Sequence, residues 1–110
     1  MLERQMKRFN GRIGPEGAIY YVNVAWCGHC KRARPIMEKL SQDLGMSLDV
    51  IDVDGEKWGD YLQQVMGPGA PRSYPTILYI ENGRATSFED ERTVRNLTDF
   101  ACAMSGQCGR

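Results

Sequence analysis

A buried strand that runs directly into a pair of closely spaced cysteines is the feature that most limits what this chain can fold into. Residues 18–24 are rich in β-branched and aromatic side chains, which predicts a strand buried on both faces of a sheet. An apolar series at helical spacing follows, formed by Ala33, Ile36, Met37, Leu40 and Leu44. Pro35 lies inside this predicted helix, where it removes a backbone donor and should kink the axis.

The next segments complete a βαβ unit and add a second helix. Residues 48–53 contain Val50, Ile51 and Val53 and predict a second strand. A helix is then predicted by the spacing of Trp58, Tyr61, Leu62, Val65 and Met66. Glycines and prolines in residues 67–71 should end that helix in a loop.

The last third of the chain predicts a ββα unit. Residues 76–80 form a third strand, and Asn82-Gly83 is a two-residue hairpin signal that leads into an antiparallel strand over residues 84–88. A final helix, with Phe100 beside its apolar stripe and Gly106 as its stop, is marked by Val94, Leu97, Ala101 and Met104. Residues 2–9 could add a short helix or strand. The order predicts an α/β fold with one mixed, four- to five-stranded sheet and helices on both faces.

Length and charge restrict the domain count and the partners. With 110 residues the chain fits one domain, with a core over about residues 17–104 and a tail over residues 105–110. The net charge is zero, so we expect no nucleic-acid or membrane partner, and we expect a monomer. Residues 1–10 contain no apolar run and the last residues contain no retention signal, which favours a cytoplasmic location.

The motif at residues 26–31 carries the candidate chemistry. Cys27 and Cys30 follow the first strand and open the helix, where free N–H groups and the positive end of the helix dipole stabilise a thiolate. Two intervening residues allow one helical turn to bring the sulfurs together as a reversible disulfide. Cys27 lies at the mouth of the helix and should attack, whereas Cys30 lies one turn further in and should resolve the mixed disulfide.

Two other interpretations of the cysteine pair remain open. The pair could be half of a structural zinc site, but His29 is the only histidine and Cys102 and Cys108 have a different spacing. The pair could also be two inert buried thiols, although a junction between strand and helix is an unusual place for them. We expect neither a metal nor an organic cofactor.

The motif and its surroundings resemble the thioredoxin superfamily, over roughly residues 17–104. Residues 26–31 are similar to the active-site run of that family, and Gly28-His29 is the version typical of protein disulfide isomerase domains. Pro35 matches the kink proline of the family. Tyr74-Pro75-Thr76 matches its cis-proline segment.

The resemblance implies a role for each matched residue. Cys27 and Cys30 would form the redox-active disulfide, and Gly28 and His29 would tune it, because an imidazole between the cysteines stabilises the thiolate. A substrate surface would be formed by Trp26, Tyr74, Pro75 and Thr76. Pro75 would be cis, and the backbone beside it would pair with an extended substrate segment.

The chain also departs from the family pattern. Family members usually bury an acidic residue six positions before the first cysteine, whereas Tyr21 stands there and is a poor base at neutral pH. Asn23 is nearby but cannot titrate. Disulfide isomerases also use a mobile basic residue to tune the second cysteine. Arg84 and Arg92 are candidates for this role, because they lie in the corresponding region of the sequence.

Cys102 and Cys108 have no counterpart that the resemblance supplies. They could form a local disulfide if the tail folds back past Gly106, act as an accessory thiol pair, or be two uninvolved thiols.

Three functional hypotheses follow. The first is an enzyme that exchanges disulfides with protein substrates through a Cys27 mixed disulfide and is recycled by a further reductant or oxidant. Gly28-His29 suggests oxidase or isomerase activity, whereas the expected location suggests thioredoxin-like reductase activity, and both stay open. The second is a binding module of the same fold with little turnover. The third, glutathione-linked exchange, fits less well because Gly28-His29 stands where that group typically has Pro-Tyr.

Overall fold

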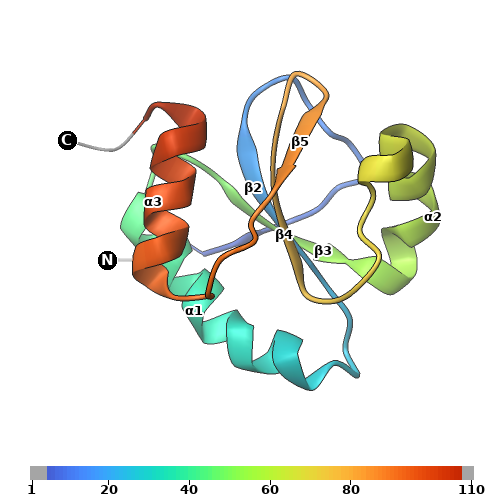
Figure 1. The fold of residues 1–110 in the computed structure, drawn as a ribbon, viewed down its shortest axis with the longest axis horizontal. Helices are drawn as coiled ribbons and strands as arrows, with labels where there is room; N and C mark the ends of the chain where they lie inside the picture. The colour runs from blue at the N-terminus through green and yellow to red at the C-terminus, as the bar shows by residue number, and fades with distance from the viewer. Residues whose placement is uncertain (1–4, 108–110) are drawn as a thin grey trace.

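The computed structural model describes residues 5–107, and these form one mixed sheet covered by helices on both faces (Figure 1). The strands are β1 (Lys7–Arg8), β2 (Ala18–Asn23), β3 (Val50–Asp54), β4 (Thr76–Glu81) and β5 (Arg84–Ser87). The helices are α1 (Gly28–Leu44), α2 (Gly55–Met66), the short 3-10 helix η1 (Gly67–Gly69) and α3 (Val94–Ser105). The predicted βαβ and ββα units are therefore confirmed.

The sheet has the strand order β1-β3-β2-β4-β5. β3 runs parallel to both β1 and β2, whereas β4 is antiparallel to β2 and to β5. All six residues of the central strand β2 are buried, as its apolar sequence predicts. The ends of β2 and β3 that lead into α1 and α2 lie at the same edge of the sheet, and the start of β4 lies beside them because Val22 pairs with Thr76.

Alternation along the strands divides the core into two layers. On one face, Ile19, Tyr21, Val50, Ile77 and Tyr79 are buried with apolar residues of α1 and α3. On the other face, Tyr20, Val22, Val53 and Leu78 pack with Leu62 and other residues of α2. Helices α1 and α3 pack against one another on the first face (Figure 1). Each layer buries side chains from several elements, so each holds the sheet and its helices as one body.

Local signals fix the ends of the elements. Pro35 lies inside α1, and that helix ends where Gly45 adopts a positive φ of 56°. Asn82 and Gly83 both have positive φ, at 50° and 77°, as a two-residue hairpin requires. Gly106 ends α3 in the left-handed conformation.

The observed bounds differ from the predicted ones in small ways. β3 begins at Val50 and not at residue 48, and the predicted loop at residues 67–71 contains η1. Of residues 2–9, for which a short helix or strand is predicted, Lys7–Arg8 form the short edge strand β1, and residues 2–4 lie outside the described residues. No helix among the described residues combines the length and the apolarity that crossing a membrane requires.

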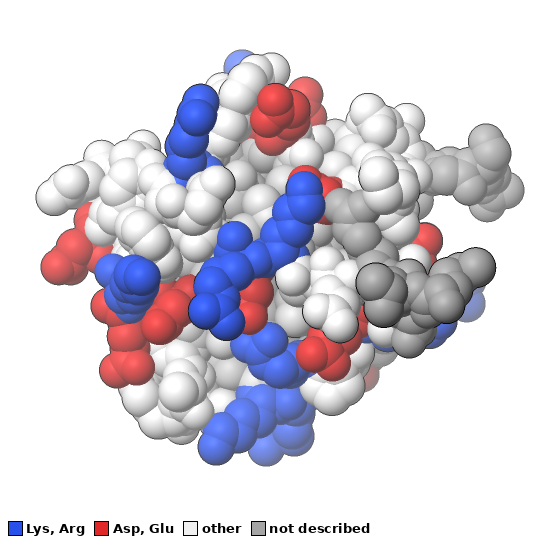
Figure 2. All heavy atoms as spheres, turned by 180° about the vertical axis from the view of Figure 1, so that it is seen from behind, with Lys and Arg blue, Asp and Glu red and all other residues white. Residues whose placement is uncertain are grey.

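Charges of both signs are spread over the surface. Figure 2 shows Lys and Arg side chains in a band down the middle of one face, with Asp and Glu side chains on both sides of it. This mixture agrees with the net charge of zero.

Candidate active site

Cys27 lies at the point where the chain leaves the sheet and enters α1. It is the N-cap residue of α1, with an extended backbone, and its Sγ accepts a hydrogen bond of 3.1 Å from the backbone N–H of Cys30. A sulfur in this position receives one of the N–H groups that a helix start leaves without an internal partner. Cys27 and Cys30 are both free thiols, so the structure represents the reduced pair.

The two thiols differ less in exposure than the sequence predicts. Cys27 retains 7% of its surface and Cys30 retains 3%, so both are buried and Cys27 is only slightly more open. The reason is the loop before β4, because the Cys27 thiol lies 3.6 Å from the carbonyl oxygen of Tyr74 and donates to it. A substrate therefore has to reach Cys27 beside this loop.

The hydrogen bonds around the pair separate the two pKa values. Burial opposes ionisation of Cys27. Hydrogen bonds from the Cys30 thiol and from the N–H groups of Cys30 and His29, with the charge of Arg92, outweigh burial and lower the pKa of Cys27 below its ordinary value. Burial and the hydrogen bond with Cys27 raise the pKa of the Cys30 thiol to about 11. Cys27 is therefore the thiol of the pair that ionises more readily and is the better candidate for the nucleophile, whereas Cys30 holds its proton to a much higher pH.

The predicted cis-proline segment lies against the thiols. The peptide bond between Tyr74 and Pro75 is cis, and Thr76 Oγ1 donates to the carbonyl oxygen of Ser73 at 2.6 Å, which fixes the turn before β4. The ring of Tyr74 packs with the group formed by Val24, Cys27 and Cys30. The structure thus brings the Tyr74-Pro75-Thr76 segment to the cysteines, as the resemblance implies.

The Tyr74 ring also touches the start of α2. A Cβ atom added at Gly55 would lie 2.5 Å from the ring, so this close approach requires a glycine. Trp26 makes an edge-to-face contact with the same ring at 6.3 Å between centroids. Its own indole is 69% exposed, and its Nε1 donates to Glu56 at 3.3 Å. Trp26 and Tyr74 therefore form an open apolar rim beside Cys27.

His29 is held on the surface by a neighbour in the same helix. Arg32 Nη2 lies 2.8 Å from His29 Nδ1. A guanidinium can only donate, so Nδ1 is the acceptor in this contact. The contribution of His29 to the Cys27 thiolate comes from its backbone N–H.

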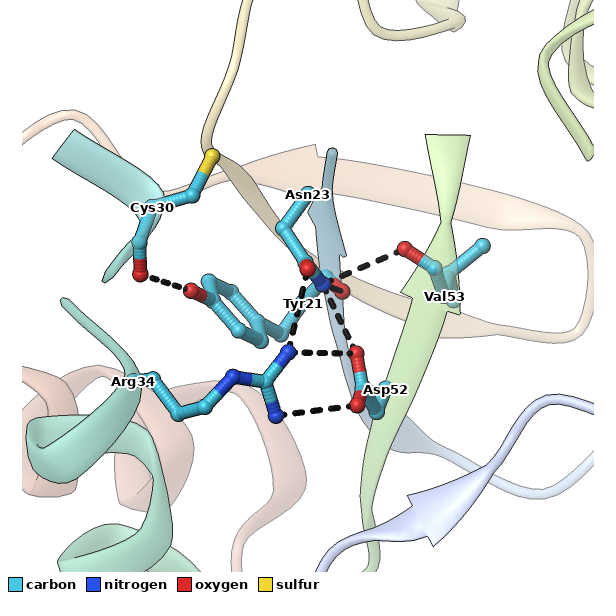
Figure 3. A network of polar contacts seen from close by, with 6 residues as sticks. All are labelled: Tyr21, Asn23, Cys30, Arg34, Asp52 and Val53. Carbon is cyan, nitrogen blue, oxygen red and sulfur yellow. Dashed lines mark hydrogen bonds and ion pairs between the residues drawn. The ribbon is translucent and has the colours of Figure 1, made fainter. Parts of the chain in front are cut away.

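Residue 21, at the position six before Cys27 that is usually acidic in the family, is a buried tyrosine that makes a hydrogen bond to the backbone of α1. Tyr21 has no exposed surface, and its hydroxyl donates a hydrogen bond of 2.5 Å to the backbone carbonyl of Cys30 (Figure 3). Burial raises the pKa of Tyr21 far above its ordinary value. The departure noted in the sequence is therefore real, and no carboxylate occupies this position.

A polar network extends from Tyr21 across β2 and β3. Arg34 of α1 forms an ion pair of 3.0 Å with Asp52 of β3, and its guanidinium lies 5.5 Å from the centre of the Tyr21 ring. The amide nitrogen of Asn23 donates to Asp52 at 2.7 Å and to the Val53 carbonyl at 3.2 Å, while its oxygen accepts from Arg34 at 3.0 Å. Figure 3 shows that the sulfur of Cys30 points away from this network.

Sequence reasoning identified Tyr21 and Asn23 but missed Arg34 and Asp52. The signal for Asp52 was available, because alternation in β3 places it on the same face as the buried Val50. An acidic residue on an inward face needs a partner. The partner itself comes from α1, and no local spacing connects Arg34 to β3.

Of the two candidate basic residues, only Arg92 lies near the thiols. Its positive charge favours the thiolate form of both cysteines. This lowers the pKa of Cys27 further and opposes part of the rise in the pKa of Cys30. Arg84 pairs with Glu81 at the hairpin end of β4, whereas the active site lies beside Thr76 at the other end. The structure therefore leaves Arg92 as the candidate and removes Arg84.

Two further predictions concern the other cysteines and a metal site. Cys102 is disulfide-bonded, so the possibility of an uninvolved thiol at this position is wrong. Cys108 lies outside the described residues, and so does any pairing that includes it. Within residues 5–107, no three His, Cys, Asp or Glu side chains gather closely enough to hold a metal ion.

The sequence of this chain is similar to that of known proteins. The model of the Thioredoxin family matches residues 4–103. Protein disulfide isomerase-like 2-2 of Oryza sativa subsp. japonica is 33% identical over 86 residues, which cover 76% of this chain and 22% of that protein. Thioredoxin of Bacillus subtilis (strain 168) is 34% identical over 58 residues, which cover 53% of this chain and 52% of that protein. The chain thus spans between about a fifth and a half of these curated relatives.

Solved structures agree on the fold. The Trx4 domain of ERdj5 superposes with a TM-score of 0.76 at 14% identity, covering 92% of this chain and 96% of that domain. Thioredoxin F from spinach chloroplast superposes with a TM-score of 0.70 at 17% identity, covering 94% and 96%. At such identities the likeness supports the architecture alone.

Proposed function

Because the chain belongs to the thioredoxin family, we propose that it catalyses thiol–disulfide exchange with protein substrates, with Cys27 as the nucleophile. The observation that carries this proposal is the hydrogen bond from the Cys30 N–H to Cys27 Sγ at the start of α1. It supports a thiolate at the position that a substrate sulfur can approach, beside the cis-proline segment.

In the first step the Cys27 thiolate attacks one sulfur of a substrate disulfide. A bond forms between Cys27 and that sulfur, the substrate S–S bond breaks, and the other substrate sulfur leaves as a thiolate that takes a proton from solvent. Formation of the mixed disulfide removes the negative charge of Cys27. In the free protein, that charge and the hydrogen bond to Cys27 both add to the raised pKa of Cys30. Because the mixed disulfide removes both, the pKa of Cys30 falls and Cys30 becomes easier to deprotonate once substrate is bound.

In the second step Cys30 loses its proton and attacks the sulfur of Cys27. The bond between Cys27 and the substrate breaks, and the second substrate sulfur leaves as a thiolate. The substrate disulfide has then gained two electrons, and the protein carries a Cys27–Cys30 disulfide. The same steps in reverse oxidise a substrate dithiol, and a further reductant or oxidant restores the starting state.

The surface beside Cys27 suits an extended polypeptide. Trp26 and Tyr74 offer aromatic surface, and the backbone around Pro75 precedes β4 without being part of the sheet. We propose that a substrate segment lies along Tyr74, Pro75 and Thr76 as an added strand, with its cysteine at Cys27.

Within this class we propose oxidase or isomerase activity in preference to reduction. The Gly28-His29 pair supports it, because the His29 N–H stabilises the Cys27 thiolate and so favours the reduced protein over its disulfide. A protein whose reduced form is favoured passes its disulfide on readily.

Turnover of a protein disulfide separates this proposal from that of a binding module. Purified protein, supplied with dithiothreitol, should catalyse reduction of insulin, and when oxidised it should introduce disulfides into reduced ribonuclease. The Cys27→Ser variant should lose both activities. A folded wild-type protein with neither activity would favour the binding module.

A further inference from the structure

The loop between β5 and α3 borders the active site and carries a run of acidic residues. Figure 1 shows this segment descending from β5 to the start of α3, beside α1. Glu89, Asp90 and Glu91 are all exposed, and Arg92 follows them. Because the charge of Arg92 acts on both Cys27 and Cys30, this loop lies within electrostatic reach of the thiols.

Two adjoining hollows lead away from the active site along this loop. The first, of about 380 Å³, has His29 and Arg32 of α1 on one side and Asp90, Glu91 and Arg92 on the other. The second, of about 530 Å³, is lined by Phe88, Glu89, Asp90, Asn96, Asp99 and Phe100 and is here called the acidic groove. Asp90 lines both hollows, so they adjoin, and His29, which lies between the two cysteines in sequence, lines the first.

The acidic groove combines aromatic walls with unbalanced negative charge. Phe88 and Phe100 are half-buried and meet edge to face, with 5.3 Å between their centroids. The charged side chains that line the acidic groove, Glu89, Asp90 and Asp99, are all acidic. Within residues 5–107 none of these three carboxylates takes part in an ion pair.

This chemistry fits the side chain of a lysine or an arginine. The aliphatic stem of such a side chain can lie on the phenyl rings while its charged end reaches the carboxylates. By contrast, the first hollow is also lined by two arginines, Arg32 and Arg92, whereas no basic residue lines the acidic groove. The attraction for positive charge therefore begins beyond the reactive sulfur.

From this arrangement we infer that the acidic groove selects substrates whose reactive cysteine belongs to a basic polypeptide segment. The lysines or arginines of that segment lie in the acidic groove while its cysteine lies at Cys27. This inference rests on the proposed exchange activity and adds a class of substrate to it. Charge complementarity of this kind acts mainly on the rate of encounter and is weakened by salt.

The test uses peptides that differ only in charge. Each peptide carries one cysteine joined in a mixed disulfide to thionitrobenzoate, and four flanking positions on one side are Lys in one peptide and Glu in the other. Attack by the reduced protein releases coloured thionitrobenzoate, so its appearance gives the second-order rate constant. We expect the Lys peptide to react on the order of tenfold faster, because each of several exposed charge pairs contributes a factor of about 1.4 to 5.

Two sets of variants with the same net charge locate the effect. The combination Glu89→Gln, Asp90→Asn and Asp99→Asn should reduce the ratio of the two rates to between about one and two. The control combination Glu16→Gln, Glu38→Gln and Asp60→Asn changes other parts of the surface and should leave the ratio near its wild-type value.

The outcomes distinguish the inference from the proposed function. Two results would overturn the inference about the acidic groove and leave the proposed disulfide exchange unaffected. One is equal rates for both peptides with the wild-type protein, and the other is the same decrease in the ratio of the two rates in both sets of variants. Failure of the wild-type protein to react with either peptide would overturn the exchange activity, and the inference with it.

Discussion

The hydroxyl of Tyr21 donates its proton to the backbone carbonyl oxygen of Cys30 across 2.5 Å. This bond ties the central strand to the turn of α1 that carries the reactive pair. The hydroxyl has only one proton to give, and burial raises the pKa of Tyr21 well above its ordinary value. Tyr21 therefore positions Cys30 and does not take the proton that Cys30 must lose.

Replacing Tyr21 by a carboxylate should accelerate release of substrate. With Tyr21→Asp we expect the Cys27 mixed disulfide to resolve roughly tenfold faster or more near neutral pH, because a positioned general base contributes about 10²–10⁴-fold. The loss of a buried aromatic ring should lower the free energy of unfolding by roughly 3–5 kcal/mol. Stopped-flow release of a labelled peptide from the preformed mixed disulfide measures the rate, after thermal unfolding has shown that the variant is folded.

Tyr21→Phe is the matched control for this change. It keeps the ring but supplies neither the hydrogen bond nor a base, so we expect no acceleration and a loss of about 1 kcal/mol of stability. A folded aspartate variant with an unchanged rate of release would mean that another group already moves the proton.

The separation of the two pKa values predicts how each thiol reacts with pH. Because the pKa of Cys27 is lowered, its alkylation by iodoacetamide should reach full speed at a lower pH than that of an ordinary cysteine, and it should slow as the pH drops through that lowered pKa. Cys30 should become reactive only as the pH rises toward about 11. Mass spectrometry of partly alkylated protein identifies the site. Equal modification of both cysteines at pH 7 would contradict the assignment.

Trapping tests the same division of roles in exchange. A Cys30→Ser variant should accumulate a stable mixed disulfide on Cys27, since no second thiol can release the substrate. A Cys27→Ser variant should accumulate little, because the remaining thiol has a raised pKa. Non-reducing electrophoresis with a disulfide-bonded peptide measures both. Equal trapping through Cys30 would reverse the roles proposed for the two residues.

Sequence patterns predicted most of the fold because the deciding signals are local. The apolar run of β2, the spacing in α1 and the Asn82-Gly83 turn each act within a few residues, and each appears where expected. Contacts between distant segments were harder to foresee. The small exposure of Cys27 depends on Tyr74, and the role of Tyr21 depends on the carbonyl of Cys30, neither of which a spacing encodes.

The ion pair between Arg34 and Asp52 should stabilise the site more than a surface pair does. Both side chains are partly screened by solvent, but Asn23 bonds to both of them, so the three act as a network. A double-mutant cycle with Arg34→Met and Asp52→Asn should give a coupling of about 1–2 kcal/mol in chemical unfolding.

Lys39 and Asp43 provide the comparison for this cycle, since they form an ion pair of 2.8 Å on the exposed side of the same helix. We expect about 0.3–0.5 kcal/mol for that pair. Similar values in the two cycles would show that Arg34 and Asp52 are no more than a surface pair.

The reduction potential of the Cys27–Cys30 pair should lie nearer to that of disulfide isomerases than to that of thioredoxins. Reference values are about −180 mV for protein disulfide isomerase and about −270 mV for thioredoxin, and we expect about −180 to −230 mV here. The physical cause is the stabilised Cys27 thiolate, which favours the reduced protein more than the disulfide.

His29 allows this cause to be tested directly. His29→Pro removes the backbone N–H that supports the Cys27 thiolate, so it should raise the pKa of Cys27 and shift the potential toward the thioredoxin value. His29→Ala keeps that N–H and removes only the imidazole held by Arg32, so it should shift the potential less. Equilibration with glutathione buffers, followed by thiol alkylation, gives each potential. A wild-type value near or below about −260 mV would indicate a thioredoxin-like reductant despite Gly28-His29, and equal shifts in the two variants would assign the effect to the ring.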